Sequence, residues 1–391
     1  MSKLSSQTLK VPRLRFPGFK GVWEEKRLGD FFEITSSKRV FESEWTTSGI
    51  PFYRAREIVK LSEDGYVDNE LFISEDMFLR YKKKYGAPKA NDILVTGVGT
   101  IGVIYVVENG DEFYFKDGNI VWLKSQNTIH SDFVKYIFGT RKVRKQVIGN
   151  AAISTVGTFT IDQAKKTKVT IPNIKEQQKI ADFLGSVDSW IENLRMQKST
   201  FESYKKSIMQ KIFSQEIRFK DDNGKNFPKW EEKRLGEVLK IGNGRDFKHL
   251  ESGNIPVFGT GGLMCLVNKS LYSGETVFIG RKGTINKPFY YNGSFWTVDT
   301  LFYTFDFKEI TPKFTDFIFQ RINWLKYNEA SGVPSLSKAT IEKIKVNIPI
   351  IQEQQKIANF LTSLDKVIES KQQQITRAEQ WKKGLMQGLF V

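Results

Sequence analysis

A seven-residue stretch, WEEKRLG, occurs twice in this chain, at 23–29 and again at 230–236. A second repeated pair excludes coincidence: IPNIKEQQKIADFLGSVDSWIE begins at Ile171, and IPIIQEQQKIANFLTSLDKVIE begins at Ile348. An internal repeat constrains the fold more than any local signal, because each copy is expected to form the same structural unit. The sequence therefore predicts a duplicated chain with pseudo-twofold symmetry.

The two copies differ between these repeated segments. The WEEKRLG pair is offset by 207 residues and the EQQKIA pair by 177, so the second copy is shorter between them. DILVTGVGTIGVIYVV (Asp92 to Val107) and ETVFIGRKGTINKPFY (Glu275 to Tyr290) both place an apolar strand before a glycine turn, yet share few residues. This pattern indicates one scaffold that presents two different binding surfaces.

Length and charge narrow the class of protein. A chain of 391 residues is long enough for two domains, each with its own core. Forty per cent hydrophobic and 13 per cent aromatic residues indicate a folded protein, so the net charge of +16 lies on a structured surface. Such a surface favours a polyanionic partner, above all nucleic acid. The alternative is that the lysines only increase solubility.

Neither a membrane segment nor a disulfide is expected. No stretch approaches the roughly 20 apolar residues that span a bilayer, and MSKLSSQTLKVPRLRFPG lacks the apolar core of a signal peptide. The single cysteine, Cys265, excludes an internal disulfide and is typical of a reducing compartment. We expect a cytoplasmic protein that makes no membrane contact.

Residues for common catalytic and metal sites are scarce. The two histidines, His130 and His249, and one cysteine cannot form the usual zinc sites or a histidine-based triad in either copy. No spaced pair of carboxylates recurs in both copies, although an unrecognised acid/base or two-metal constellation stays open. We therefore expect no catalytic residue, no metal and no cofactor bound by this chain.

Two glycine-rich segments resemble cofactor-binding loops only in part. Gly97 to Gly102, GVGTIG, fits half of the dinucleotide-binding fingerprint, but the following VIYVV favours a strand where a helix is required. It is predicted to be a turn between two strands. FGTGG, at 258–262, resembles the loop that binds S-adenosylmethionine in methyltransferases, yet the chain has no N-P-P-[FY] motif.

Two long helices are predicted from apolar residues that recur at alternating steps of four and three, a heptad pattern sustained over about four heptads. The positions predicted to pair are Ile180, Leu184, Val187, Ile191 and Leu194 in the first copy and Ile357, Leu361, Leu364, Ile368 and Ile375 in the second. Two such helices should form a coiled coil, and roughly 40 residues at about 1.5 Å each make a helix of about 60 Å. The alternative is that each helix only closes its own domain.

The predicted architecture is mixed, α/β or α+β, with two globular domains separated by two long antiparallel coiled-coil helices. The predicted ranges are an N-terminal segment at 1–22, a first domain at 23–172, a helix at 173–215, a linker at 216–229, a second domain at 230–349 and a helix at 350–391.

Cations concentrate near predicted turns and short helices of both domains. Such side chains bind backbone phosphates, and arginine and lysine also bind base edges in the major groove. Any one cluster could instead be a solvated surface. With two threonines of the second domain's glycine turns, the predicted DNA contacts are Lys82, Lys83, Lys84, Arg141, Lys142, Arg144, Lys145, Arg245, Lys248, Thr260, Arg281, Lys282, Thr284 and Lys287.

The order of these motifs resembles the specificity subunit of type I restriction-modification systems. W-x-x-x-R-L-G begins each domain, IP-x-x-x-EQQKIA-x-FL-x-x-x-D closes it, and the resemblance extends from about Phe16 to Val391. IPVFGTGG, IGRKGTIN and FWTVDTLFY resemble one recurrent class of target recognition domain. The first domain departs from that class at GVGTIG.

The resemblance implies a function. Each domain would be a target recognition domain that binds one half of a bipartite double-stranded DNA site, and the helices would fix the gap between the halves. They would also bind two modification subunits, which use S-adenosylmethionine to methylate adenine. Restriction subunits would use ATP and Mg to translocate on DNA and cleave it. The alternatives are a DNA-binding scaffold that works without a methyltransferase, and a single-chain modification enzyme, which the missing N-P-P-[FY] motif disfavours.

Overall fold

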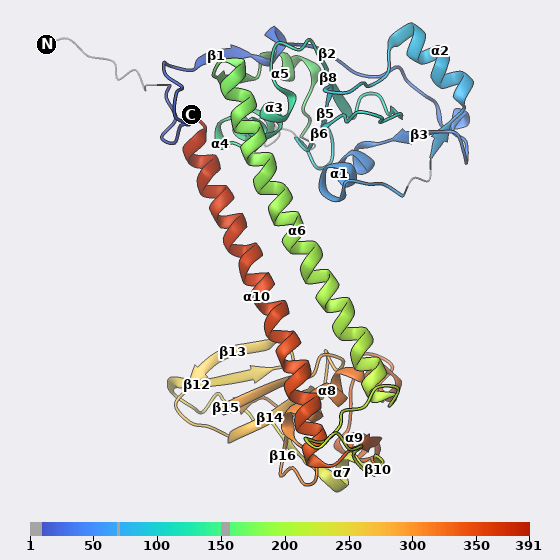
Figure 1. Ribbon diagram of the computed structural model, residues 1–391, viewed down its shortest axis with the longest axis vertical. Coiled ribbons are helices and arrows are strands. Elements are labelled where there is room, and N and C mark those ends of the chain that lie inside the picture. Colours follow the sequence, from blue (N-terminus) through green and yellow to red (C-terminus); the bar gives the residue numbers. More distant parts are fainter. Residues whose placement is uncertain (1–9, 69–70, 150–156) are drawn as a thin grey trace, which may run out of the picture. The chain divides into compact units, whose positions relative to one another are not determined.

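The computed structural model describes residues 10–68, 71–149 and 157–391 (Figure 1). Contacts divide the chain into two compact units: unit 1 is Met1–Arg195 with Gln373–Val391, and unit 2 is Met196–Gln372. Both units combine helices with sheets, so the predicted mixed fold class is confirmed.

Two long helices each contribute to both units. They are α6, Ile174–Phe213, and α10, Ile351–Leu389, and both are uninterrupted in Figure 1. Each begins two residues after a proline, Pro172 or Pro349. The residue before a proline favours an extended backbone and so stays in the strand, and proline has no N–H for the sheet, so the strand ends there and the helix begins after it. Within the described ranges, no helix is both long enough and apolar enough to cross a membrane.

The first and last strands of each globular part pair with each other as a two-stranded antiparallel sheet, called here the closing sheet. These sheets pair β1 (Glu24–Arg27) with β9 (Lys168–Ile171) in unit 1 and β10 (Glu231–Arg234) with β17 (Lys345–Ile348) in unit 2. The register is the same, since Glu24 lies opposite Ile171 and Glu231 lies opposite Ile348. The repeated segments therefore form the same element twice, and the predicted duplication is confirmed.

The described residues of unit 1 form two more sheets. One has the strand order β2-β8-β5-β6 and is antiparallel, and the other has the order β4-β3-β7. GVGTIG connects the antiparallel strands β5 and β6, which confirms that it is a turn between strands. The other strands and α-helices described in unit 1 are β2 (Phe32–Thr35), β3 (Ile50–Tyr53), α1 (Ala55–Asp64), β4 (Phe72–Ile73), α2 (Glu75–Tyr85), β5 (Ile93–Thr96), β6 (Ile104–Val106), β7 (Tyr114–Phe115), β8 (Ile120–Ser125), α3 (Ser131–Phe138), α4 (Arg141–Ile148) and α5 (Ile161–Lys166).

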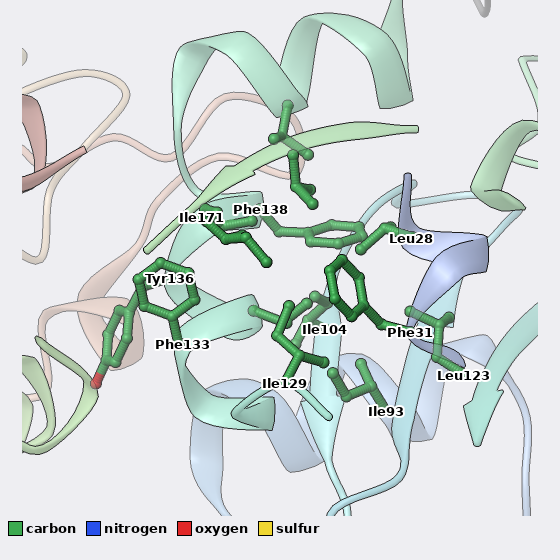
Figure 2. Close-up of a cluster of buried hydrophobic side chains, with 14 of the residues drawn as sticks. Leu28, Phe31, Ile93, Ile104, Leu123, Ile129, Phe133, Tyr136, Phe138 and Ile171 are labelled. Atoms are coloured by element: carbon green, nitrogen blue, oxygen red, sulfur yellow. The ribbon is translucent and has the colours of Figure 1, made fainter. Parts of the chain in front are cut away.

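The core of unit 1 forms where the four-stranded sheet meets α3. Figure 2 shows Ile93 of β5 and Leu123 of β8 beside Phe133 of α3 and Ile171 of β9, all of them buried. The hydroxyl of Tyr136 points away from this cluster, so α3 presents a polar group on its other side (Figure 2). Aromatic and β-branched side chains fill this core, as expected for a sheet that packs on helices.

Unit 2 is built on one six-stranded sheet with the order β11-β16-β14-β15-β12-β13. β12 and β15 pair in parallel, and the other pairs are antiparallel. GRKGTIN lies between the antiparallel strands β14 and β15, so the second copy also has a turn there. The other strands and α-helices of unit 2 are α7 (Leu235–Val238), β11 (Lys240–Asn243), β12 (Ser252–Gly259), β13 (Gly262–Val267), β14 (Tyr272–Gly280), β15 (Phe289–Thr297), β16 (Leu301–Phe305), α8 (Pro312–Arg321) and α9 (Lys338–Lys343).

The long helices pair in an antiparallel direction inside each unit. In unit 1, Arg195 of α6 binds Glu379 of α10 at 2.6 Å, and Asp188, one heptad earlier on α6, binds Lys382, which lies later on α10. In unit 2, Lys205 binds Asp365 at 2.5 Å. Ion pairs between neighbouring helices fix their register.

The residues predicted to pair belong to three different environments. Val187, Ile191 and Leu194 pack on Ile375 and Ala378 of the partner helix. The first turns of the helices instead enter the domain cores, with Ile180 and Leu184 in unit 1 and Ile357, Leu361 and Leu364 in unit 2, whereas Ile368 is half-buried. Both alternatives from the sequence thus describe part of each helix: the beginning closes the domain, and a later part packs on the other helix.

A buried carboxylate anchors the beginning of each long helix. Glu176 accepts two hydrogen bonds of 2.8 Å from the guanidinium of Arg15, and these bonds raise the pKa of Arg15. Glu353 accepts the same pair of bonds from Arg218, at 3.1 and 2.6 Å. Neither glutamate is exposed to solvent, so each depends on its arginine for a counter-charge.

The neighbouring glutamines of both copies bind the globular parts. Gln177 accepts a hydrogen bond from the backbone N–H of His130 and donates one to the carbonyl of Pro172. Gln354 likewise accepts from the N–H of Thr311 and donates to the carbonyl of Pro349. The glutamate and the first glutamine of each EQQ motif are thus buried with fixed hydrogen-bond partners, whereas the second glutamine is exposed in both copies.

In unit 1 the segment around Leu14 is bonded to the end of α10. In unit 2 the segment that follows α6 is bonded to the end of α6 in the same way. The N–H of Leu14 donates to the carbonyl of Gly388 at 2.9 Å in unit 1, and the N–H of Ile217 donates to the carbonyl of Lys211 at 3.2 Å in unit 2. Phe390 contacts Trp23 and Phe133, while the aromatic contacts of Phe213 are with Trp230 and Phe314. Residues 10–22 and the linker at 216–229 therefore occupy equivalent places in their units.

The buried pair predicts a large effect of Arg218→Ala. Removal of one partner of a buried ion pair typically costs about 3 kcal/mol, because the other charge stays buried and unpaired. We expect the urea midpoint of unit 2 to fall, and Arg15→Ala to do the same for unit 1. Arg39→Ala is the control, since Arg39 is 65% exposed in its pair with Asp117 and should contribute less than about 1 kcal/mol. Equal midpoints for Arg218→Ala and Arg39→Ala would contradict this role.

Candidate nucleic-acid interface

Three glycine turns of unit 2 meet at the segment that connects β15 to β16. The backbone N–H groups of Arg281 and Lys282 both donate to the carbonyl of Thr300, at 2.8 and 3.2 Å. Arg245 donates its N–H to the carbonyl of Thr297 at 2.8 Å. The N–H of Val298 donates to the carbonyl of Phe258, the residue before the third turn, at 259–262. These bonds hold three separate loops together at the end of strands β15 and β16.

Glycine is needed where these loops come together. A Cβ on Gly244 would lie 1.9 Å from the carbonyl oxygen of Val298, so no other residue fits at this position. Gly283 has a φ of +88° and donates its N–H to Pro334 at 2.8 Å. A Cβ there would lie 3.8 Å from Oγ1 of Thr260, so the turns at 259–262 and 280–284 are adjacent. Gly244 and Gly283 are thus required by the close approach of the loops and by the backbone conformation of the turn.

Five of the predicted DNA contacts in unit 2 are brought together by this arrangement. They are Arg245, Thr260, Arg281, Lys282 and Thr284. Among the described residues, no hydrogen bond or ion pair connects Lys248 or Lys287 to this cluster.

The charge of this cluster is largely unneutralised. Arg245 and Lys282 are exposed, and neither forms an ion pair with any described residue. The guanidinium of Arg281 is oriented by a 3.3 Å bond to the carbonyl of Asp299 and lies over the ring of Phe302. Exposed cations beside a rigid turn are suited to phosphates or base edges.

In unit 1 the cations lie on helix α4 and not on the turn. Val143 and Val147 form the buried side of α4, and a Cβ on Gly102 would lie 2.8 Å from Cγ1 of Val147. Helix α4 therefore packs directly on the GVGTIG turn. Thr140 caps the helix by accepting the N–H of Val143 at 3.4 Å.

The exposed side of α4 lines a cationic groove with the last turns of α10. The groove has six cations and no acidic side chain among its lining residues: Arg13, Arg141, Lys142, Arg144, Lys145 and Lys383. Lys142 is less available than the others, because its ammonium group binds Oγ1 of Thr170 at 2.9 Å and approaches Glu25 at 3.6 Å. Arg13 and Lys383 come from opposite ends of the chain, and no local sequence pattern indicates that they lie together.

The three lysines of α2 are not part of this groove. Figure 1 shows α2 far from α4 within unit 1. Lys82 pairs with Glu112 at 3.1 Å and lies over the ring of Phe78, while Lys84 lies over Tyr85. Lys83 is exposed. The structure therefore brings the cations of α4 together but leaves Lys82, Lys83 and Lys84 as a separate group.

No group of three or more histidine, cysteine, aspartate or glutamate side chains in the described ranges could hold a metal ion. Both histidines have local roles: His130 precedes α3, and the ring of His249 packs on Trp296. Cys265 is a half-buried residue of β13.

The sequence matches a family model described as type I restriction modification DNA specificity domain, over residues 21–200 and 228–380. A putative type I restriction enzyme specificity subunit of Haemophilus influenzae is 36% identical over 163 residues, which span 41% of this chain and 39% of that relative. A putative type I restriction enzyme specificity subunit of Methanocaldococcus jannaschii, MjaX, is 24% identical, and the alignment spans 93% of this chain and 92% of that one.

The fold is similar to a solved structure over almost the whole length. The crystal structure of a type I restriction-modification S subunit from M. genitalium has a TM-score of 0.64 and 18% identity. The similarity covers 97% of this chain and 99% of that chain.

The cluster in unit 2 predicts the salt dependence of a double variant. Arg281→Ala with Lys282→Ala should weaken binding of double-stranded DNA and lower the slope of log affinity against log salt by about 0.9 for each lost phosphate contact. Titrations at several salt concentrations would measure both quantities. Lys269→Ala with Lys343→Ala is the control, because both lysines are exposed and lie outside the cluster. Equal slopes for the double variant and the parent would exclude phosphate contacts at this turn.

Proposed function

Since this chain belongs to the family of type I restriction-modification DNA specificity proteins, we propose that its two units recognise two different halves of one double-stranded DNA site. The supporting observation is that the two units share the same closing sheets and long helices but carry their exposed cations on different elements. The closing sheets have the same register in both copies, whereas the cations lie on the turn at 280–284 in unit 2 and on α4 in unit 1. One scaffold with two surfaces suits an asymmetric, bipartite target.

The chemistry in this proposal belongs to partner subunits. The chain supplies binding energy for its own sequence, and base contacts contribute about 1 to 3 kcal/mol of discrimination each. Two modification subunits bind S-adenosylmethionine and methylate adenines, which requires that the target base leave the helical stack. Restriction subunits use ATP and Mg. This complex would assemble in the cytoplasm, where the DNA is.

The long helices give the two half-sites a defined separation. Both α6 and α10 are continuous across the boundary between the units, and packed apolar residues and ion pairs hold them together within each unit. A second contact is gained at high effective concentration only when the linkage allows both contacts at once. A paired helix is suited to this because it bends little compared with a flexible linker.

The helices predict a change of the gap when they are shortened. Deletion of one heptad from the paired part of each helix keeps the apolar register and removes about 10 Å, or about three base pairs of DNA. The preferred gap between the two half-sites should shorten accordingly while both half-sites stay the same. Methylation mapping would measure the gap. An unchanged gap in the shortened protein would exclude the helices as its determinant.

The proposed function is tested by expression of the chain with the modification subunit of the same system in a host without DNA methylation. Single-molecule sequencing then locates modified adenines. We expect a bipartite motif that is present with both proteins and missing with either alone. A soluble complex that methylates no adenine would contradict the proposal and favour a scaffold that works without a methyltransferase.

A further inference from the structure

The edge strand of unit 2 is apolar and exposed. β13 is the last strand in the order of the six-stranded sheet, and among the described residues it pairs with β12 alone. Leu263, Met264 and Leu266 of β13 are exposed. No charged residue occurs in the sequence from Ile255 to Asn268. Exposed edge strands usually carry charges that prevent other molecules from pairing with them, so an uncharged edge is suited to contact with another molecule.

A β-bulge brings two consecutive apolar side chains to the surface at the end of the β12–β13 hairpin. Val257 lies opposite Cys265. The next residue, Phe258, lies opposite Leu263, so Met264 is an extra residue in β13. Successive residues of a regular strand point to opposite faces, whereas Leu263 and Met264 are both more than half exposed. We call these two side chains the apolar tip.

The hairpin beneath the apolar tip is anchored on both faces. On one face Cys265 packs on the buried cluster that contains Trp296. On the other face the ring centre of Phe258 lies 5.2 Å from that of Phe278 and 5.0 Å from that of Tyr291. The apolar tip therefore has a fixed position in unit 2, where the hairpin forms one margin and α9 the opposite one (Figure 1).

The apolar tip adjoins the cation cluster of unit 2. A Cβ on Gly259 would lie 2.8 Å from Sδ of Met264 and 3.4 Å from Cγ2 of Val298. Met264 thus lies against the segment at which the three glycine turns meet. The turn of the hairpin, at 259–262, is also adjacent to the cationic turn at 280–284. Exposed cations and exposed apolar side chains therefore form one continuous surface.

From this we propose that the apolar tip contacts the 5-methyl group of a thymine in the half-site bound by unit 2, and that this contact makes the base pair a specificity position. The neighbouring cations, Arg245 and Lys282, would bind phosphates beside it. The inference rests on the proposed function, because it assigns one base contact to a chain proposed to bind DNA.

The chemistry of the apolar tip suits the major groove. That groove admits a two-stranded β-ribbon, and the thymine methyl is the apolar group that base pairs present there. Leucine and methionine side chains have no hydrogen-bond donor, so they distinguish thymine by its methyl group and not by its polar edge. The flexible thioether of Met264 can follow the shape of a methyl group closely.

A second copy of this chain fits the same edge less well. Pairing of two β13 strands would bring two clusters of exposed cations close together, and like charges repel. The phosphates of DNA instead complement these cations. Charge therefore favours DNA over a second copy as the molecule that covers the apolar tip.

The test combines a change of the base with a change of the side chains. Selection from a random pool with the purified full chain first identifies the site. Each thymine of the site is then replaced by deoxyuridine, which lacks only the methyl group, and the affinities of the parent and of Leu263→Ala with Met264→Ala are measured. We expect one thymine whose replacement weakens binding by the parent about fourfold, the effect of one buried methylene. The double variant should bind both DNAs equally.

A matched control separates this contact from a general loss of apolar surface. Met196→Ala with Leu325→Ala changes the same two residue types at positions that are also more than half exposed but lie outside the hairpin. This control should keep the preference of the parent for thymine. Melting temperatures equal to that of the parent would show that both variants are folded, and the response of the parent to deoxyuridine requires no variant.

The outcomes distinguish this inference from the proposed function. A bipartite site at which no thymine methyl matters, or a double variant that still prefers thymine, would overturn the inference and leave the proposed function standing. A double variant that binds every sequence equally weakly while the parent is indifferent to the methyl group would overturn it in favour of an unspecific wedge. A dimeric parent and a monomeric double variant, again without a methyl effect, would assign the edge to a second copy. Selection of no bipartite site would contradict the proposed function and the inference together.

Discussion

The buried glutamate at the start of each long helix is the interaction on which the rest of the structure depends. Glu176 and Glu353 are inaccessible to solvent, and each is compensated by an arginine that lies before the domain in sequence, Arg15 or Arg218. A buried charge is costly unless its partner is in place. One ion pair therefore joins the start of a domain to the helix that ends it, and the adjacent glutamine bonds the same helix to the domain's interior.

This shared frame explains why the two units can differ elsewhere. The closing sheet, the EQQ motif and the aromatic contacts of Phe213 and Phe390 are the same in both, so the surface loops are free to change. Unit 2 places Arg281 and Lys282 on a glycine turn, whereas unit 1 packs a cationic helix on the corresponding turn. Loops on a rigid scaffold are the usual place for binding residues, and two unlike surfaces are what a bipartite target requires.

Periodicity and repetition made much of the fold predictable. The duplication, the two long helices and the turn at Gly97 to Gly102 follow from local patterns, which the structure confirms. The pairs of Arg15 with Glu176 and of Arg218 with Glu353 join residues more than 130 positions apart, so no local pattern indicates them. The repeated Arg-Phe dipeptide before each WEEKRLG was the available signal. Charge alone could not distinguish the lysines of α2 from the cations of α4, because clustering depends on packing.

The central claim is that one duplicated chain recognises two unlike sequences at a fixed separation. It is tested most directly by selection of double-stranded DNA from a random pool with the purified full chain, followed by sequencing of the bound fraction. The account predicts two different half-sites, separated by a gap of constant length and unspecified sequence. A single uninterrupted motif, or two identical half-sites, would contradict it.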